Sequence, residues 1–168
     1  MVDVVDQATR SRMMAGIGAR DTKPEIALRR MLHRAGLRYR LHVKDLPGRP
    51  DIVLPSRRGV IFVHGCFWHR HGGCHWCSTP ASNTEFWASK FERNVQRDGA
   101  ATAALHSVGW RIAVVWECGL RAAYLDRTVG QVLAWARFGS GDFESDVVRP
   151  TSRQAADCGW PNGTGRVT

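Results

Sequence analysis

The chain has 168 residues, 43% of them hydrophobic, which is enough for one globular core and too few for two comfortable domains. Its 24 Lys and Arg residues outnumber its 15 Asp and Glu residues, and the net charge of +9 favours nucleic acid as a partner, although a merely basic protein has the same composition. No apolar run approaches the roughly 20 residues of a membrane span, and the first residues lack the order of a signal peptide, so we expect a cytoplasmic protein without a membrane partner.

The amino-terminal segment predicts an arm followed by a helix. Residues 1–20 have mixed polarity and are expected to order only on binding. The next segment, 22–36, has apolar residues on one helical face, Thr22 as a candidate N-cap and Gly36 as the residue that ends the helix. A helix over this segment is therefore expected.

Three strands are expected after this helix. The first segment alternates in polarity, the other two are rich in β-formers, and a turn at 55–59 separates those two. The three segments are residues 37–43, 51–54 and 59–65. Glycine, cysteine and histidine then break all periodicity over 66–82, which predicts a loop or metal knuckle.

The second half of the chain predicts helix, strand and helix at residues 84–109, 110–118 and 128–138. Core anchors on the first of these helices are Trp87, Phe91, Val95 and Leu105. We expect one folded domain at 21–138, between the arm and a flexible tail at 139–168. The order of elements predicts an α/β fold, a mixed sheet flanked by helices.

Two carboxylates are candidates for phosphate chemistry. Asp51 opens a strand directly after Pro50, and a carboxylate at a strand edge in a basic cleft is a natural Mg²⁺ ligand, whereas a turn-forming Pro-Asp is the alternative. Glu25 can bind the water shell of a metal, or it can complete a capping box with Thr22. The two roles of Glu25 can coexist.

Histidines flank the turn that follows the third expected strand. His64 and His69 lie on either side of it, and a histidine beside a metal-bound phosphate is a candidate general base. A structural or metal-ligand role is the alternative for each.

The loop also has the composition of a zinc site. Five cysteines are an odd count, and in a reducing compartment their position beside histidines favours metal over disulfides. Six candidates compete for three local places, with Cys118 as a distant fourth ligand. They are Cys66, His69, His71, Cys74, His75 and Cys77.

An aromatic pair, Phe67 and Trp68, lies inside this loop. Braced by a metal, the two rings can form an apolar wedge that unstacks base pairs, or they can pack against the core. Trp87, Met13 and Met14 can join the wedge, with core or arm positions as their alternative.

Several segments together resemble one family, the very short patch repair (Vsr) DNA mismatch endonucleases. The segments include "LPGRPDIVL", "VIFVHGCFWHRHGGC", "TEFWASKFERNVQRD" and "GWRIAVVWEC", and the resemblance runs from about residue 3 to residue 137. It implies a restriction-endonuclease-like fold with a structural zinc knuckle. It also implies Mg²⁺-dependent nicking of double-stranded DNA on the 5′ side of the thymine in T:G mismatches, which arise from deamination of 5-methylcytosine.

The resemblance also implies roles for single residues of the catalytic site. Asp51 and the Val63 carbonyl would bind one or two Mg²⁺ ions, and Glu25 and His64 would support the metal's water shell and the phosphate. His69 would be the general base. Asp98 would orient it.

By the same resemblance, Cys66, His71, Cys74 and Cys118 would hold Zn²⁺, which leaves His69 free for catalysis. The rings that intercalate beside the mismatch would be Phe67, Trp68 and Trp87, and Met14 would enter the other groove. Two departures from the family are noted: Val63 replaces a hydroxyl side chain found in some relatives, and Cys77 lies close enough to substitute for Cys74.

Two other functions compete with the endonuclease. A non-enzymatic zinc DNA-binding module explains the charge, the cysteines and the wedge, but gives Asp51 and His69 no role. A zinc hydrolase with an open metal position would use His69 as a ligand. We expect a monomer, with mismatch-repair proteins as further candidate partners.

Overall fold

The computed structural model describes residues 20–146 of the chain. Seven helices and strands follow one another in this part: α2 (Lys23–Arg34), β1 (Ile52–Leu54), β2 (Gly59–His64), α3 (Thr84–Ser107), β3 (Arg111–Trp116), α4 (Leu125–Phe138) and β4 (Phe143–Glu144). Short 3₁₀ turns at Pro55–Arg57 and Glu117–Leu120 follow β1 and β3. The expected arm, apart from residue 20, lies outside the described residues, and Met13 and Met14 lie outside with it.

One four-stranded sheet, in the order β1-β2-β3-β4, forms the centre of the fold. β1 and β2 pair antiparallel, whereas β2 pairs parallel with β3 and β3 pairs parallel with β4. Each parallel connection runs through a helix, α3 and then α4, as parallel strands require. The predicted mixed sheet flanked by helices is confirmed.

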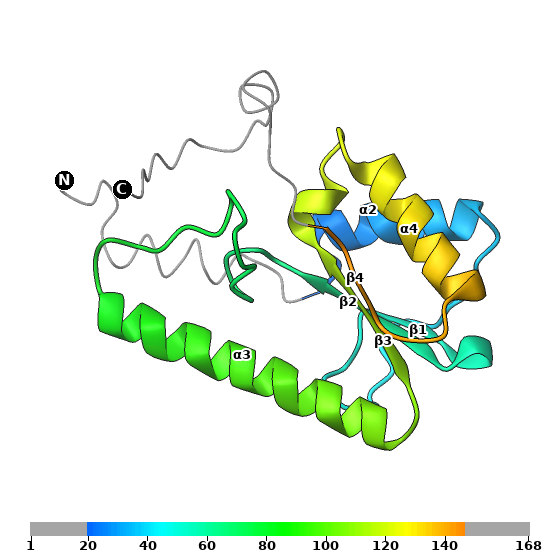
Figure 1. Ribbon diagram of the computed structural model, residues 1–168, viewed down its shortest axis with the longest axis horizontal. Coiled ribbons are helices and arrows are strands. Elements are labelled where there is room, and N and C mark those ends of the chain that lie inside the picture. The colour runs from blue at the N-terminus through cyan, green and yellow to red at the C-terminus, as the bar shows by residue number, and fades with distance from the viewer. Residues whose placement is uncertain (1–19, 147–168) are drawn as a thin grey trace.

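Helices cover both faces of the sheet, with α2 and α4 on one side and α3 on the other (Figure 1). Alternate strand residues contribute to the two cores, as the two-residue period of a strand requires. The larger core joins α2 and α4 to Ile52, Leu54, Ile61, Ala113 and Val115. The smaller core contains Val53, Val60, Leu105 and Ile112.

Helix α3 is longer than the sheet is wide, so its first half projects beyond the strands and lies beneath the loop that follows β2 (Figure 1). Val95, expected in the core, is 49% exposed, whereas Trp87 and Phe91 in the same half of the helix are buried. Leu105 in the second half of α3 is fully buried, as expected. No helix among the described residues is long and apolar enough to cross a membrane.

The strand expected at 37–43 does not form. A single isolated bridge, Arg40 to Val53, is present instead. His42 has φ 55°, in the left-handed region, which ends any extended run. The alternating polarity reflects a segment that packs Leu37 and Tyr39 against the larger core without forming a ladder.

The ordered domain also extends beyond the boundary expected at residue 138. Phe143–Glu144 form β4, and the Ser145 amide donates to the Val114 carbonyl at 2.9 Å. Asp142 accepts a hydrogen bond from the Ile112 amide at 2.8 Å. A strand was not expected here, because Phe143 with one polar residue on each side is too short a pattern to indicate one. The rest of the expected tail, from residue 147, lies outside the described residues.

Arginine side chains satisfy carbonyls at the carboxyl ends of all three described helices. Arg58 donates to the carbonyls of Val108 and Gly109 after α3. Arg137 donates to the Ala35 carbonyl after α2, at 2.7 Å. At the end of α4, the acceptors are the Ala136 carbonyl for Arg57 and the Gly139 carbonyl for Arg111. Cations at these positions complement the helix dipole and pair carbonyls that lack intrahelical partners.

Candidate functional site

Asp51 lies immediately before β1, next to the buried Pro50, and faces the end of β2. Its Oδ2 atom accepts a hydrogen bond from the Val63 amide at 2.7 Å. Burial, together with the charge of Glu25, raises the pKa of Asp51 to about 6 against the lowering effect of the Val63 amide. Burial therefore disfavours the ionised form of Asp51, and a bound cation would stabilise it. The carboxylate oxygens have lone pairs that the Val63 amide does not use, so they can bind such a cation.

Glu25 is 4% exposed and serves the start of α2. Its carboxylate accepts hydrogen bonds from the Asp21 amide at 3.0 Å and the Thr22 hydroxyl at 2.8 Å. Thr22 in turn accepts from the Glu25 amide, so the capping alternative is realised, although the glutamate binds the amide of Asp21 rather than that of Thr22.

Arg29 links this cap to the neighbourhood of Asp51. Its guanidinium donates to Glu25 at 2.8 Å and to Asp21, and the Arg29 side chain is 9% exposed. Arg29 lowers the pKa of Asp51 and Glu25 raises it, so both charges act on the Asp51 carboxylate. Glu25 therefore combines a capping role with an electrostatic effect on the candidate metal ligand.

His64, His69 and Asp98 form one cluster, with ligand atoms within 4.8 Å of one another. The imidazoles of His64 and His69 stack at 3.9 Å between centroids and 6° between planes. His69 Nδ1 is 2.5 Å from Asp98 Oδ2, on α3. This contact leaves Nε2 of His69 directed away from the carboxylate, the arrangement by which a carboxylate fixes the tautomer of a general base.

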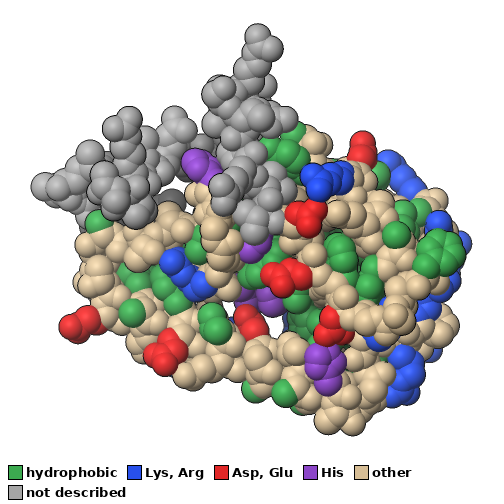
Figure 2. Space-filling view, in the orientation of Figure 1, with side chains coloured by type: hydrophobic (Ala, Val, Ile, Leu, Met, Phe, Trp, Pro, Cys, Tyr) green, Lys and Arg blue, Asp and Glu red, His purple; other side chains and the backbone are tan. Residues whose placement is uncertain are grey.

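His64 lies at the end of β2 and is in contact with the rings of Phe62, His69 and Trp116. Burial, together with the neighbouring His69, lowers the pKa of His64 to about 4. His64 is therefore neutral near pH 7 and offers one N–H donor. In the space-filling view the surface is hollowed between α3 and the sheet, and histidine and acidic side chains gather there (Figure 2).

A second cluster, of three thiols and an imidazole, lies behind the same loop. Its members are all buried: Cys66, His71, Cys74 and Cys118. Nδ1 of His71 is 3.6 Å from Cys66 Sγ and 3.5 Å from Cys118 Sγ. Tetrahedral zinc, with bonds of about 2.3 Å to sulfur and about 2.05 Å to nitrogen, separates such donors by about 3.6 Å. The four side chains fit zinc.

Three of the competing candidates lie outside this cluster. His69 belongs to the cluster with His64 and Asp98, and His75 is exposed. Cys77 is partly buried at the edge of the thiol cluster, with its amide bonded to the Cys74 carbonyl at 3.1 Å. Hydrogen bonds from the Cys66 thiol to the neighbouring sulfurs of Cys118 and Cys74, together with burial, raise the pKa of Cys66. A cation favours the thiolates that this crowding otherwise disfavours.

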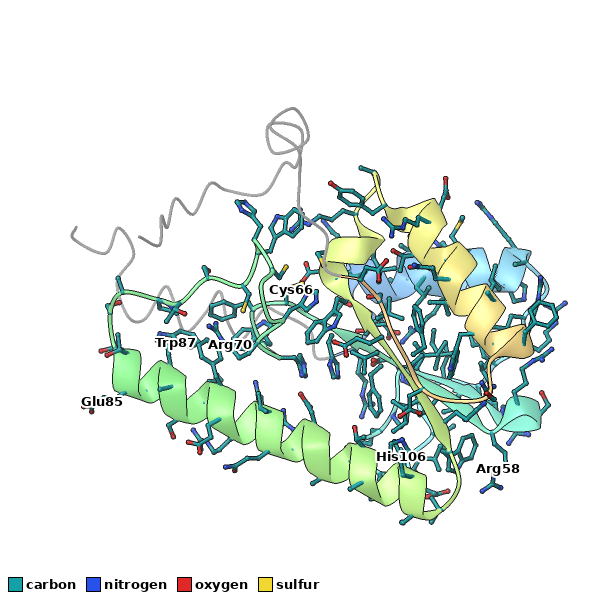
Figure 3. All side chains as sticks on the ribbon, in the orientation of Figure 1. Arg58, Cys66, Arg70, Glu85, Trp87 and His106 are labelled. Carbon is teal, nitrogen blue, oxygen red and sulfur yellow. The ribbon has the colours of Figure 1, made fainter. Side chains whose placement is uncertain are left out.

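The loop presents its aromatic pair against the projecting half of α3. Phe67 contacts Trp68, Trp87 and Phe91, with centroid separations of 5.0, 5.5 and 5.1 Å. Trp87 is 5% exposed and supports the other rings from below, whereas Phe67 and Trp68 are partly exposed. Figure 3 shows Trp87 and Arg70 in the space between the loop and α3.

Polar side chains that the sequence did not single out fix this surface. Asn94 donates to the Trp68 carbonyl at 3.1 Å, and the Lys90 ammonium lies 5.1 Å from the Trp68 ring. Arg70 stacks 4.4 Å from Phe91 and donates to the Ser78 carbonyl at 2.8 Å. The spacing of Trp87, Lys90, Phe91 and Asn94, three or four residues apart, was the available signal, because such residues share one helix face.

Known proteins resemble this chain over most of its length. The sequence model of the family described as "DNA mismatch endonuclease Vsr" matches residues 2–76. The DNA mismatch endonuclease Vsr of Escherichia coli (strain K12) is 49% identical over 121 residues, which are 72% of this chain and 77% of that protein. The type II nicking enzyme V.XorIIP of Xanthomonas oryzae pv. oryzae is 51% identical over 120 residues, covering 71% and 88%.

Among solved structures, the catalytic domain of the homing endonuclease I-Bth0305I overlaps 68% of this chain and 95% of its own, with 20% identity and a TM-score of 0.47. The sequence relatives are far more similar, and the chain spans most of their length. On that similarity, the chain belongs to the Vsr family of DNA mismatch endonucleases.

Proposed function

We propose that this DNA endonuclease nicks double-stranded DNA on the 5′ side of the mispaired thymine in T:G mismatches, in very short patch repair, and that it requires Mg²⁺. The observation that carries the proposal is the contact between His69 Nδ1 and Asp98 Oδ2, because His69 lies on the same loop as the aromatic wedge and acts electrostatically on Asp51. A reactive group and a base-reading surface are thereby held within one short segment.

The donors around Asp51 suit a hard cation. Asp51 supplies a carboxylate, and Val63 donates its amide to it. Since the N–H and C=O of a strand residue point to the same neighbour, the Val63 carbonyl faces the Asp51 side as well. These two residues would hold the ion, with Glu25 and its water shell behind them. The ion would supply positive charge to the scissile phosphate and to the leaving oxygen.

The chain's own groups move the proton. His69, oriented by Asp98 through Nδ1, accepts a proton from water at Nε2 and holds it as imidazolium beside the Asp98 carboxylate. Neutral His64, stacked on His69, donates an N–H toward a phosphate oxygen. Zinc in the cluster of Cys66, His71, Cys74 and Cys118 would be structural, because four protein ligands leave no open position.

Mismatch selection follows from deformation of the duplex. Opening a base step costs a few kcal/mol, and the cost is least where a wobble pair already stacks poorly. Phe67 and Trp68 would enter the opened step, supported by Trp87 and Phe91. The arm at residues 1–20, with Met14, would engage the opposite groove. We further propose a monomer, a catalytic domain beginning at residue 21 with a tail after it, and mismatch-repair proteins as partners.

Omission of the divalent cation tests the proposal against a zinc DNA-binding module. We expect nicking of a T:G duplex to fall to background without Mg²⁺ and to return on its addition, while mismatch binding changes little. The measurement is strand-specific cleavage on a denaturing gel, beside gel-shift affinity. Cleavage that persists with zinc as the only metal would favour the zinc hydrolase, and binding without cleavage under any condition would favour the module.

Removal of the two wedge rings tests the recognition step. Phe67→Ala with Trp68→Ala should bring the affinities for mismatched and paired duplexes to within about twofold, because stacking is worth roughly 1 to 3 kcal/mol per base. Titration of both duplexes measures the ratio. Phe138→Ala is the control, since that ring is 84% exposed at the end of α4 and away from the loop. Retained discrimination in the double variant would exclude the wedge.

A further inference from the structure

Four aromatic rings connect the zinc cluster to the catalytic pair. The His71 imidazole stacks on the Trp116 indole, with centroids 4.1 Å apart and 4° between planes. The edge of Trp116 meets His64 at 5.4 Å and 69°, and His64 stacks on His69 at 3.9 Å. The rings therefore form one continuous series from a candidate zinc ligand to the candidate base.

Trp116 is held from three sides. It ends β3, and in the parallel ladder it lies directly beside His64 of β2. Its indole Nε1 donates to Glu144 Oε1 at 2.7 Å, and its amide donates to Ser145 Oγ at 2.9 Å. The Ser145 amide completes the attachment by donating to the Val114 carbonyl. Trp116 is 7% exposed, so the ring has little freedom to turn.

We propose that Trp116 is a positioning residue for the nicking reaction, that it sets the plane of His64 and through it that of His69, and that Glu144 of the short strand β4 fixes it. The inference rests on the proposed function, because it concerns the geometry of His64 and His69 at the phosphate. It gives β4 a role in the site although no β4 side chain belongs to the catalytic cluster.

Proton transfer tolerates only a small error in the position of the base, which is why a positioning residue affects the rate. A base must lie within hydrogen-bond reach of the attacking water, and a displacement of about 1 Å can cost about 100-fold in rate. Within the described residues, the His69 side chain contacts the Asp98 carboxylate and stacks flat on His64. His64 in turn rests on Trp116. Through the Trp116 indole, the fixed position of His71 in the zinc cluster restrains His64 and His69, which do not belong to that cluster.

Variants of Trp116 test the positioning role in the full-length, zinc-loaded protein. We expect Trp116→Leu to lower the single-turnover nicking rate by about 10- to 100-fold, with the dissociation constant for the mismatched duplex within about twofold of wild type and zinc content unchanged. Trp116→Phe, which keeps a ring and loses the indole donor, should fall between. A merely structural residue would instead change melting temperature and zinc content, or leave the rate unaltered.

Glu144 provides a second, gentler test should Trp116→Leu fail to fold. Glu144→Ala should slow nicking, and Glu144→Gln should restore most of the rate because an amide oxygen also accepts from the indole. Asp146→Ala is the matched control: this carboxylate, two residues on, binds Arg127 and Gln131 instead of Trp116. It should nick at the wild-type rate.

The outcomes separate this inference from the proposed function. Wild-type nicking rates in all Trp116 and Glu144 variants, or rates that fall only in proportion to lost zinc, would overturn the positioning role and leave the endonuclease intact. A wild-type protein that nicks no mismatched duplex with Mg²⁺ would overturn the proposed function, and the inference with it.

Discussion

Asp51→Asn is expected to lower nicking by about 1,000-fold or more while mismatch binding stays near normal. The amide keeps an acceptor for the Val63 amide, so the local fold persists, but it loses the charge that gathers Mg²⁺. Several kcal/mol of charge stabilisation in the transition state depend on that ion, and each 1.4 kcal/mol is a factor of ten in rate. Single-turnover cleavage and gel-shift titration measure the two effects.

The exposed Asp45 provides the control, because Asp45→Asn removes the same charge six residues upstream and should leave nicking unchanged. Substantial residual cleavage by Asp51→Asn would exclude Asp51 as the principal metal ligand.

The same substitution should stabilise the protein in the absence of added Mg²⁺. The pKa of Asp51 is raised from 3.8 to about 6 by burial, so its ionised form opposes folding above pH 6. We expect Asp51→Asn to increase the free energy of unfolding at pH 7 to 8 by about 1 to 3 kcal/mol. This gain should shrink as the pH falls from 6 through 3.8, because well below 3.8 the wild-type carboxyl is neutral in both states. Denaturant titration across this pH range measures it.

His71→Ala is expected to release the zinc and with it the ordered knuckle. Only one buried imidazole and three thiols gather in the cluster, and binding of a structural zinc contributes on the order of 10 kcal/mol to folding. Without His71 the reading surface loses its support, so both mismatch binding and nicking should fall to background. Metal content by atomic emission, together with the melting temperature, checks the expectation.

His69→Ala, two residues earlier, is the informative comparison. It should keep one zinc per chain and near-normal mismatch binding, while nicking falls by about 100- to 10,000-fold, the usual contribution of a general base. Loss of zinc from His69→Ala would transfer this residue to the structural cluster. Retention of zinc by His71→Ala would remove His71 from it.

Local patterns were sufficient for the elements with strong periodicity. Thr22 and Gly36 bracket a helix that begins and ends within two residues of them, and the apolar run before Cys118 forms the central strand β3. The alternating polarity at 37–43 wrongly predicted a strand, because a segment can bury every second side chain without forming a ladder of hydrogen bonds with a neighbouring strand. Strand β4 was missed because its stability comes from pairing with β3 rather than from its own residues.

The sequence was enough to name candidate residues for the site, but it did not give most of the contacts between them. Resemblance to a family supplied Asp98 as the partner of His69, and the structure brings the two together across 29 positions of sequence. Spacing alone could not choose Cys74 over Cys77, since both lie within reach of one loop; the fold places Cys74 beside Cys66. Trp116 lies in a segment that supports the family resemblance, but nothing in the sequence indicated a role for its side chain, because an aromatic at the end of a strand is ordinary core composition.

The arginines at the helix ends alter what the net charge of +9 means for DNA. Arg57, Arg58, Arg111 and Arg137 are bonded to main-chain oxygens, with fixed geometry. Guanidinium groups that are already bonded to carbonyls are poorly placed to contact the phosphates of a DNA backbone. Fewer counterions should therefore leave the duplex on complex formation than the overall excess of basic residues implies, and affinity should decline less steeply with rising ionic strength.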